Sequence, residues 1–449
     1  MEHIEAVKLI QLIESERPVM GIKYKGISVW PFLRIYIADA LSDTVRAQKA
    51  SKDTIKSVLE GLFFYGLLPL LKKKSIWVFT NVERRKRLGG LNIHRVCGSI
   101  SELENENALF WEKPGVGIRP CKKEERFEKS VISEAILLML TSIIEKIGKP
   151  KEIEGQNIME GILNDYDFSF NYKGKINHLF AQYQSMKLLL QICPKPKVCF
   201  IESPFSEMGV VMAFKEKNVP VIELQHGVIN EHHLGYNAPF SSKEMYPDGI
   251  CVYGQSEYDY LEKRKERYCK DIYQTGYYFI DKASCFFEND VFLSYRNNYK
   301  KIILVSGQVP EERMFSFTKA LADNKNYLFV YVPRNHYGNE SNLDNLQIWN
   351  GANIYECIKW CDIHVTMYST TCLEAQFFHK PTIFYNQENL SRQYYGDTLS
   401  EENGCYYVDT IADFWAAVKV LEEQTIEFKE MFAHDTLTNM RRVLNKYIS

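Results

Sequence analysis

The sequence contains no long apolar run. The best candidate, residues 59–71, is interrupted by polar residues, glycine and proline and falls short of the ~18 residues that a membrane span needs. The N-terminus has no basic start followed by an apolar stretch, so we expect no secretory leader and a cytoplasmic protein. The motifs of serine hydrolases, Walker-type ATPases and His-Glu-x-x-His zinc enzymes are also missing, and these classes are excluded.

An excess of charge and a cysteine framework are absent as well. The formal net charge is −2, from 55 Lys and Arg against 57 Asp and Glu, which argues against a nucleic-acid-binding protein. Of the 11 cysteines, only Cys357 and Cys361 lie close together, without the second pair or histidine cluster of a zinc site. We therefore expect reduced, buried thiols and no metal.

What the chain does contain is the patterning of an α/β protein. Residues 1–75 show apolar residues at helical spacing, and short β-rich runs begin at residue 75. The clearest unit is a strand at 197–201, a helix at 206–217 and a strand at 219–224. Strand, helix and strand within about thirty residues form a βαβ crossover, which implies a parallel sheet.

The length of 449 residues suggests two or three domains, and the pattern supports two. After a looser stretch at 282–300, strand and helix alternate again from residue 301 onward. We therefore predict an N-terminal lobe over residues 1–284 and a C-terminal Rossmann-like lobe over residues 285–449, each with a parallel sheet. Residues 1–75 form a mostly helical extension of the first lobe.

A phosphate site is expected where the predicted strand at 362–366 ends. Ser369, Thr370 and Thr371 fall between this strand and a helix, where free backbone N–H groups and the helix dipole favour an anion. Glu374 follows within the first helical turn, placed to accept the hydroxyls of a ribose. A capping motif without a ligand explains the same residues.

A family resemblance favours the ligand site. The Ser/Thr-rich turn followed by Leu373-Glu374-Ala375 and Lys380-Pro381 resembles the donor site of GT-B glycosyltransferases. The resemblance implies two Rossmann-like lobes facing across a cleft, with the C-terminal lobe binding a nucleotide sugar. It assigns the donor phosphates to the three hydroxyl residues and the ribose to Glu374. Residues 271–276, with Asp281 after them, resemble the end of the N-terminal lobe in this fold.

Two further loops of the C-terminal lobe are donor-site candidates. Arg334 and His336 follow the predicted strand at 327–332, and a guanidinium fork suits phosphate oxygens. This segment is loosely similar to the nucleotide-contacting turn of bacterial sialyltransferases and Kdo transferases. A structural salt bridge is the alternative for Arg334. Gly307 and Gln308 end the strand at 301–306, where a glycine lets a ligand or a backbone come close.

The N-terminal lobe offers a candidate base. Gln225-His226-Gly227 ends the strand at 219–224 and resembles a step in bacterial capsule and O-antigen transferases, including glycerophosphotransferase-like and Kdo-transferase-like groups. A sugar hydroxyl needs a base of near-neutral pKa, and His226 is the first candidate. Glu207 is the second, and Glu202 is a further carboxylate at this edge. The acceptor side of the cleft is assigned to Gln225, Gly227, His232 and Tyr236.

The near-neutral total charge hides a basic segment. Residues 46–95 hold twelve Lys and Arg against three acidic residues, a net charge of +9 that leaves −11 for the rest. Leucine and aromatic residues at 62–71 precede Lys72, Lys73 and Lys74, a composition typical of an interfacial anchor on an anionic membrane. A core helix with solvated lysines at its end is the alternative.

These observations and the resemblance together favour one function. We expect a metal-independent glycosyltransferase of bacterial surface-polysaccharide assembly, such as capsule or lipopolysaccharide. It would move a sugar from a nucleotide-sugar donor to a glycan or lipid-linked acceptor, without a cofactor. The alternatives are a polyol-phosphate transferase with a CDP-activated donor, similar in layout to teichoic-acid polymerases, and a non-catalytic scaffold.

Overall fold

Helices make up most of the described residues at the start of the chain. The computed structural model describes residues 3–42, 52–115, 118–148, 152–308, 311–334, 338 and 343–448. Pro31 lies in the first turn of the second helix, where a proline costs no hydrogen bond. Arg34 on that helix is fully buried, and its Nε lies 2.5 Å from Oε1 of Glu14. The elements are α1 (His3–Glu16), β1 (Lys23–Tyr24), β2 (Ile27–Ser28), α2 (Trp30–Leu41) and α3 (Lys52–Tyr65).

The chain divides into two units, each built around a parallel sheet. The first unit comprises residues 1–253, 257–279 and 434–449, and the second comprises residues 254–256 and 280–433. The sheet of the first unit has seven strands, and all its pairings are parallel. In spatial order they are β11 (Asp271–Gln274), β10 (Gly249–Val252), β9 (Val221–Leu224), β8 (Val198–Ile201), β3 (Ile76–Asn81), β6 (Ala108–Lys113) and β7 (Val131–Ser133).

Helices cover both faces of this sheet because its strands are apolar on both sides. Trp77 and Phe79 of β3 face a core shared with α5 (Ala135–Ile147), α7 (Tyr172–Ile192) and α8 (Met208–Glu216). Ile76 and Val78 point the other way, toward α4 (Gly98–Glu104) and α16 (Thr436–Ile448). The remaining helices of this unit are α6 (Gln156–Asp165) and parts of α9 (Gln255–Glu262) and α10 (Tyr278–Ser284).

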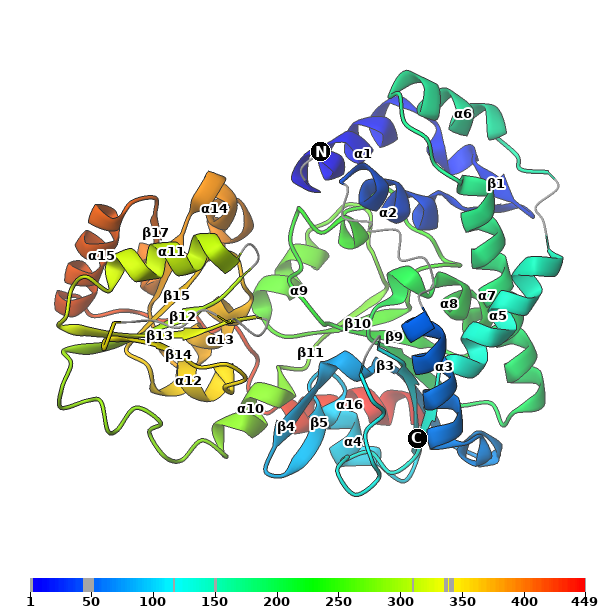
Figure 1. Ribbon diagram of the computed structural model, residues 1–449. Coiled ribbons are helices and arrows are strands. Elements are labelled where there is room, and N and C mark those ends of the chain that lie inside the picture. The colour runs from blue at the N-terminus through cyan, green and yellow to red at the C-terminus, as the bar shows by residue number, and fades with distance from the viewer. Residues whose placement is uncertain are drawn as a thin grey trace. The chain divides into compact units, whose positions relative to one another are not determined.

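The C-terminal helix is the element that differs from the predicted division. Although it ends the chain, α16 belongs to the first unit, and Figure 1 shows it in red among the cyan elements of that unit. Its apolar stripe of Met440, Val443 and Leu444 packs into the core on the α4 face. The Tyr447 hydroxyl lies 2.7 Å from that of Tyr273 on β11. Burial of this stripe explains why the chain returns.

The second unit repeats the parallel design with six strands, paired in parallel throughout. The predicted α/β fold class with two parallel-sheet units is therefore confirmed. In spatial order the strands are β14 (Leu346–Ile348), β13 (Tyr327–Val332), β12 (Lys301–Ser306), β15 (Ile363–Thr366), β16 (Thr382–Tyr385) and β17 (Cys405–Val408).

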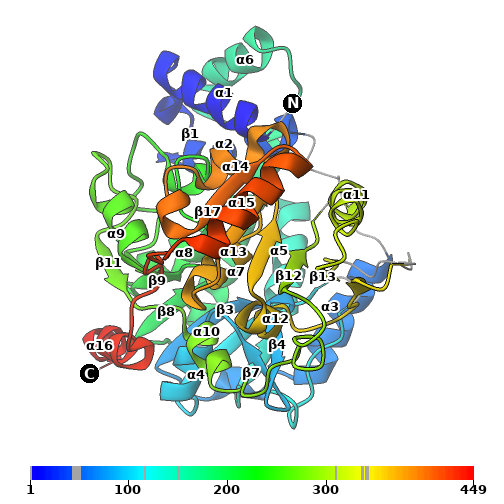
Figure 2. The same ribbon diagram turned by 90° about the vertical axis from the view of Figure 1, so that its left-hand side faces the viewer.

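Helices again lie on both faces of the second sheet (Figure 2). One face packs against α11 (Glu311–Leu321) and α15 (Ile411–Glu423), and the other against α12 (Ile354–Trp360) and α13 (Thr371–Phe377). A shorter helix, α14 (Leu390–Tyr395), follows β16. Every strand that the sequence pattern predicted in this unit is present.

The cysteines are unpaired and mostly buried, as the sequence predicted. All 11 cysteines are free thiols, and only Cys285 is exposed. Within the described ranges, no helix is long and apolar enough to cross a membrane.

Candidate functional site

The strand order of each unit marks one place for a ligand. In both sheets the first strand lies inside the sheet, with the next strands on one side and the later ones on the other. In open parallel sheets, ligands bind outside the carboxyl ends of the strands where this order reverses. The point lies between β3 and β8 in the first unit and between β12 and β15 in the second.

In the second unit, the predicted residues Gly307 and Gln308 hold the edge together. Gln308 is buried, and its Oε1 accepts a hydrogen bond of 2.7 Å from the backbone N–H of Tyr368. A Cβ added at Gly307 would lie 2.9 Å from the Cα of Pro333. The glycine therefore admits the backbone of the neighbouring loop, one of the two reasons that the sequence suggested.

The turn after β15 brings Ser369, Thr370 and Thr371 together at this edge. The Ser369 hydroxyl accepts a hydrogen bond of 3.3 Å from the backbone N–H of Thr371. Thr370 precedes α13 without capping it through its side chain. Within the described part of the chain, nothing hydrogen-bonds to the buried Oγ1 of Thr371. A hydroxyl of this kind costs free energy unless a further group binds it.

Arg334 lies on the loop that follows β13. Its backbone N–H donates a hydrogen bond of 2.8 Å to Oε1 of Glu311, while its side chain is exposed. None of the residues that the structure describes pairs with its guanidinium, so the alternative of a structural salt bridge has no support there. The predicted His336 lies outside the described residues.

Glu374 is covered more completely than a ribose contact would suggest. It lies on α13 with 3% of its surface exposed. Its charge adds to the effect of burial in raising the pKa of Cys372 and of Tyr395. The carboxyl group is therefore held against the core side of the helix.

A buried histidine that the sequence pattern did not mark lies beneath this edge. Nε2 of His364 lies 2.8 Å from the Ser306 hydroxyl, and Nδ1 lies 3.2 Å from the Thr382 hydroxyl. Burial lowers the pKa of His364 to about 3, so the ring is neutral. It ties β12, β15 and β16 together. A histidine inside an apolar strand run was the signal for it.

In the first unit, an ion pair spans the point where the strand order reverses. Arg84, in the loop after β3, places its Nε 2.8 Å from Oε1 of Glu202, which follows β8. Burial raises the pKa of Glu202 to about 7, although the charges of Arg84 and Arg95 oppose the shift. The sequence pattern drew attention to Glu202, but it counted the two arginines only in the basic segment at 46–95.

His226 follows β9 beside this pair. Its ring hydrogen-bonds to the backbone of Glu202, while none of the described residues bonds with its buried Nδ1. Burial, the charges of Arg84 and Arg95, and the neighbouring His233 together lower the pKa of His226 to about 3. The imidazole is therefore neutral at physiological pH and has a nitrogen available for a ligand.

The residues predicted beside His226 have different surroundings. Gly227 adjoins open space, since an added Cβ would meet no atom within 4 Å. Gln225 is buried, and its Oε1 accepts a hydrogen bond of 2.6 Å from the backbone N–H of Tyr253. His232 is half-buried, with Nε2 lying 3.5 Å from Oε1 of Glu231.

Tyr236 does not line an open surface. Only 2% of it is exposed, and its hydroxyl donates to the carboxyl group of Glu223, 2.7 Å away. Its ring packs edge-on against Phe205 and Tyr268. The structure thus gives it a packing role, because this ring cannot stack on a sugar without rearrangement.

Glu207, the second candidate base, lies in a buried group of charges. Its Oε1 lies 3.2 Å from Nζ of Lys113, and it directly precedes α8. Glu134, which follows β7, shares this environment: burial and the charge of Glu207 raise its pKa to about 8. Glu207 therefore has an ion-pair partner in Lys113, which His226 lacks among the described residues.

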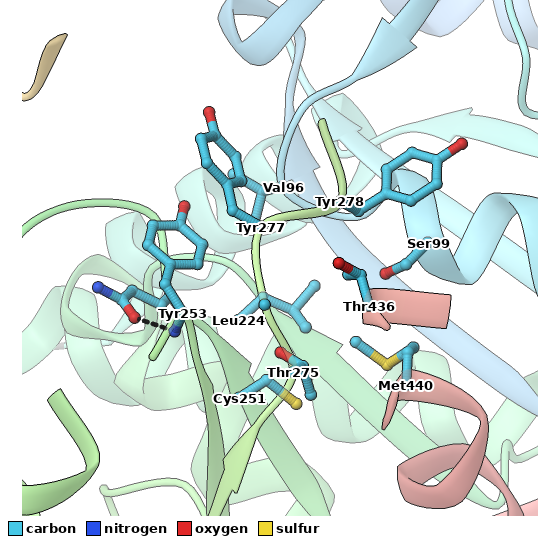
Figure 3. Close-up of a pocket in the computed structure, with 12 residues that line it drawn as sticks. Val96, Ser99, Leu224, Cys251, Tyr253, Thr275, Tyr277, Tyr278, Thr436 and Met440 are labelled. Carbon is cyan, nitrogen blue, oxygen red and sulfur yellow. Dashed lines mark hydrogen bonds between the residues drawn. The ribbon is translucent and has the colours of Figure 1, made fainter. Parts of the chain in front are cut away.

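The cavity in Figure 3 lies on the same edge of the first sheet. It holds about 10 Å³, enough for roughly one water molecule and too little for a nucleotide. Tyr253 and Tyr277 stack there, with their ring centroids 4.6 Å apart, and the Arg95 guanidinium lies 6.0 Å from the Tyr277 ring. Across the described residues, no group of three His, Cys, Asp or Glu could hold a metal ion.

Comparisons with known proteins give structural likeness alone. No protein-family model and no curated protein matches the chain. Among solved structures, the UDP-GlcNAc 2-epimerase of Methanocaldococcus jannaschii is 10% identical, with a TM-score of 0.49, covering 83% of this chain and 99% of its own. The glycotransferase of kitacinnamycin is 12% identical, with a TM-score of 0.49, covering 84% and 97%. The UDP-GlcNAc-bound UDP-GlcNAc 2-epimerase of Neisseria meningitidis is 11% identical, with a TM-score of 0.47, covering 83% and 99%.

Proposed function

We propose that the protein is a glycosyltransferase that moves a sugar from a nucleotide-sugar donor to a glycan or lipid-linked acceptor. The observation that carries the proposal is that polar side chains suited to substrate binding lie at the carboxyl edge of both sheets, where ligands of parallel sheets bind. One edge offers hydroxyl groups and an arginine, and the other offers a neutral imidazole with an available nitrogen. Two such edges suit a reaction with two substrates. The setting we propose is surface-polysaccharide synthesis at the cytoplasmic side of a membrane.

The second unit would bind the donor. Ser369, Thr370 and Thr371 would contact the phosphates, and the exposed Arg334 would neutralise their charge. The Oγ1 of Thr371 supports this assignment because a phosphate oxygen would supply the hydrogen-bond partner that it lacks among the described residues. Glu374 would reach the ribose only through the small part of it that is exposed.

The first unit would hold the acceptor and the base. A transfer needs the acceptor hydroxyl to lose its proton as it attacks the anomeric carbon. The Nδ1 of His226 would take that proton, and the open space at the neighbouring Gly227 supports this assignment. The departing nucleotide would be stabilised by the hydroxyl residues and by Arg334 through hydrogen bonds and charge.

A membrane-facing surface would serve a lipid-linked acceptor. Phe63 and Leu68, at the end of α3 and in the following turn, are 82% and 76% exposed. On α5, which packs against α3, Ile143 and Ile147 are 53% and 82% exposed. Large apolar side chains rarely gather on a free surface unless it binds something. The exposed lysines 72, 73 and 146 beside them match an anionic leaflet.

A thermal-shift panel of UDP, CMP, GDP, dTDP and CDP tests donor binding. A nucleotide present at about 100 times its dissociation constant should add about 2.7 kcal/mol of stability. Thr371→Val should weaken that nucleotide by roughly 2- to 10-fold without destabilising the protein, because the hydroxyl that it removes lacks a partner among the described residues. Thr318→Val is the matched control: its Oγ1 donates to the Met314 carbonyl inside α11, so it should change stability and leave binding intact.

Product analysis tests the reaction itself. A glycosyltransferase releases a nucleoside diphosphate, or CMP from a CMP-sugar, and transfers no phosphate from the donor to the product. A polyol-phosphate transferase with a CDP-activated donor releases CMP and transfers the donor's other phosphate to the product. If the nucleotide sugar is altered when no acceptor is present, or if no nucleotide in the panel binds, the proposal is wrong.

A further inference from the structure

At the carboxyl edge of its sheet, the first unit has more positive charge than Glu202 neutralises. Nε of Arg84 is bonded to Glu202, but among the described residues nothing bonds to its two terminal nitrogens, and 35% of the side chain is exposed. A guanidinium has five N–H donors, so most of its capacity remains available. This capacity faces the place where a ligand of a parallel sheet is expected.

Two further cations lie close to Arg84. Arg95 follows β5 (Leu91–His94), and its backbone N–H donates to the Arg84 carbonyl over 3.1 Å. Lys86 lies on β4 (Arg85–Leu88), and desolvation together with the charges of Arg95 and Arg84 lowers its pKa. Arg84 and Arg95 thus share one carboxylate, Glu202, and Lys86 lies in the field of both arginines. Such crowding is unfavourable unless an anion relieves it.

We propose that the acceptor carries an oxyanion, a phosphate or a carboxylate, and that Arg84, Arg95 and Lys86 bind it at this edge. The proposal names the acceptor's chemical class and so rests on the transferase function proposed above. Arginine is suited to the task because its planar fork matches two oxygens of a phosphate or carboxylate. The acceptor hydroxyl would then lie near His226, which shares the field of both arginines.

Binding of an anion here would also prepare the base. In the ligand-free protein, the arginine charges add to burial in depressing the pKa of His226 to about 3, which makes the imidazole a weak base. An anion between Arg84 and Arg95 would offset their charge and raise that pKa. Proton removal would therefore become efficient only when the correct acceptor is bound. This couples acceptor recognition to catalysis.

Sulfate binding, measured by calorimetry at constant ionic strength, tests the anion site directly. Arg84→Lys keeps the charge beside Glu202 but removes the fork, and we expect it to weaken sulfate binding about tenfold. Lys86→Ala, at an exposed position of β4, should weaken it several-fold while leaving the fold intact. The matched control is Arg17→Lys, an exposed arginine of the same unit paired with Asp165, which should bind sulfate as the parent does.

Glu202→Gln should act in the opposite direction. Glu202 competes with the ligand for Arg84, so its neutralisation should strengthen sulfate binding several-fold at pH 8. In the parent, binding should strengthen as pH falls through about 7, where this carboxyl group takes up a proton. Its charged and titratable neighbours are Arg84, Arg95, Glu207 and His94. The Gln variant should lose that dependence.

Phosphate and acetate in place of sulfate distinguish the two acceptor groups, since the tighter-binding probe identifies the class. The site does not exist if sulfate, phosphate and acetate all fail to bind, or if Arg84→Lys and Lys86→Ala bind them like the parent. Thr371→Val should leave sulfate binding at this site unchanged. If no nucleotide binds the second unit while Arg84→Lys and Lys86→Ala still weaken sulfate binding, the transferase proposal fails and the anion site stands.

Discussion

The hydroxyl of Tyr236 donates a hydrogen bond of 2.7 Å to Oε1 of Glu223, a carboxyl group with no exposed surface inside the sheet of the first unit. Tyr268 donates to the other oxygen over 2.6 Å. These two bonds favour the charged carboxylate, yet burial outweighs them and raises the pKa of Glu223 to about 8. The Glu223 carboxyl group is therefore protonated in the folded protein at neutral pH.

This raised pKa predicts a loss of stability as pH increases. The unfolded chain gives up the Glu223 proton near the ordinary pKa, about 4.5, whereas the folded protein keeps it up to about pH 8. The contribution of Glu223 to the free energy of unfolding is therefore complete below about pH 4.5 and declines until about pH 8. Within that window the slope approaches ~1.4 kcal/mol per pH unit. Glu223→Gln should remove this slope and be more stable than the parent at pH 8. Denaturation at several pH values checks it, with the exposed Glu60→Gln as the control that should follow the parent.

The close approach of the Pro333 backbone to Gly307 predicts that a side chain at this position destabilises the protein. Gly307→Ala would force a Cβ to within 2.9 Å of the Pro333 Cα, so the two loops must separate. We expect a loss of about 1–3 kcal/mol in the free energy of unfolding, as for other overpacked sites. Gly161→Ala on α6 is the control, because no atom lies within 4 Å of its added Cβ, and it should stabilise the helix by roughly 0.5–1 kcal/mol. Equal stability of the two variants would contradict the close approach.

The sequence predicted the edges of the sheets better than the orientation of the side chains there. Strand runs are apolar and short, so Ser306, Thr366 and Leu224 could be recognised as strand ends from the pattern alone. Burial depends on contacts between distant segments, which one sequence does not display. Tyr236, assigned to a cleft, is therefore found inside the core, and Glu374 is almost fully covered.

The same limit explains what the sequence pattern missed. Arg84 and Arg95 stand in a loop rich in basic residues, and composition gave them no role beyond a membrane-facing charge. Their placement beside Glu202 depends on β3 and β8 becoming neighbours, although 116 residues, 82–197, lie between the end of β3 and the start of β8. The apolar stripe of α16 packs against the sheet of the first unit, but nothing in the sequence told which sheet it would cover.

The exposed apolar surface predicts binding to anionic vesicles. Lys72 and Lys73 are exposed, whereas Lys74 is buried and its Nζ donates to the Glu106 carbonyl, so the test should spare Lys74. Replacing the first two by alanine should lower binding to vesicles containing phosphatidylglycerol, by about 1 kcal/mol per lysine, and the loss should shrink at high salt.

A second arm tests the apolar part of that surface. Ile143→Glu and Ile147→Glu should abolish vesicle binding while leaving the fold intact, because both side chains are largely exposed. Leu293→Glu is a matched control on the second unit, where the leucine is 70% exposed. Sedimentation with vesicles measures each variant. Binding by the Ile147→Glu variant equal to that of the parent would show that α5 does not touch the membrane.

Replacement of His226 should lower turnover without weakening donor binding. Its Nδ1 is the buried nitrogen that nothing bonds among the described residues, and Gly227 leaves space for a substrate beside it. His226→Ala should lower kcat by about 10²- to 10⁴-fold, the usual contribution of a general base, while nucleotide affinity stays at the parent's value. His178→Ala, a partly exposed histidine paired with Glu145 on another helix, should keep full activity. If Glu207→Gln lost far more turnover than His226→Ala, the carboxylate beside Lys113 would be the base instead.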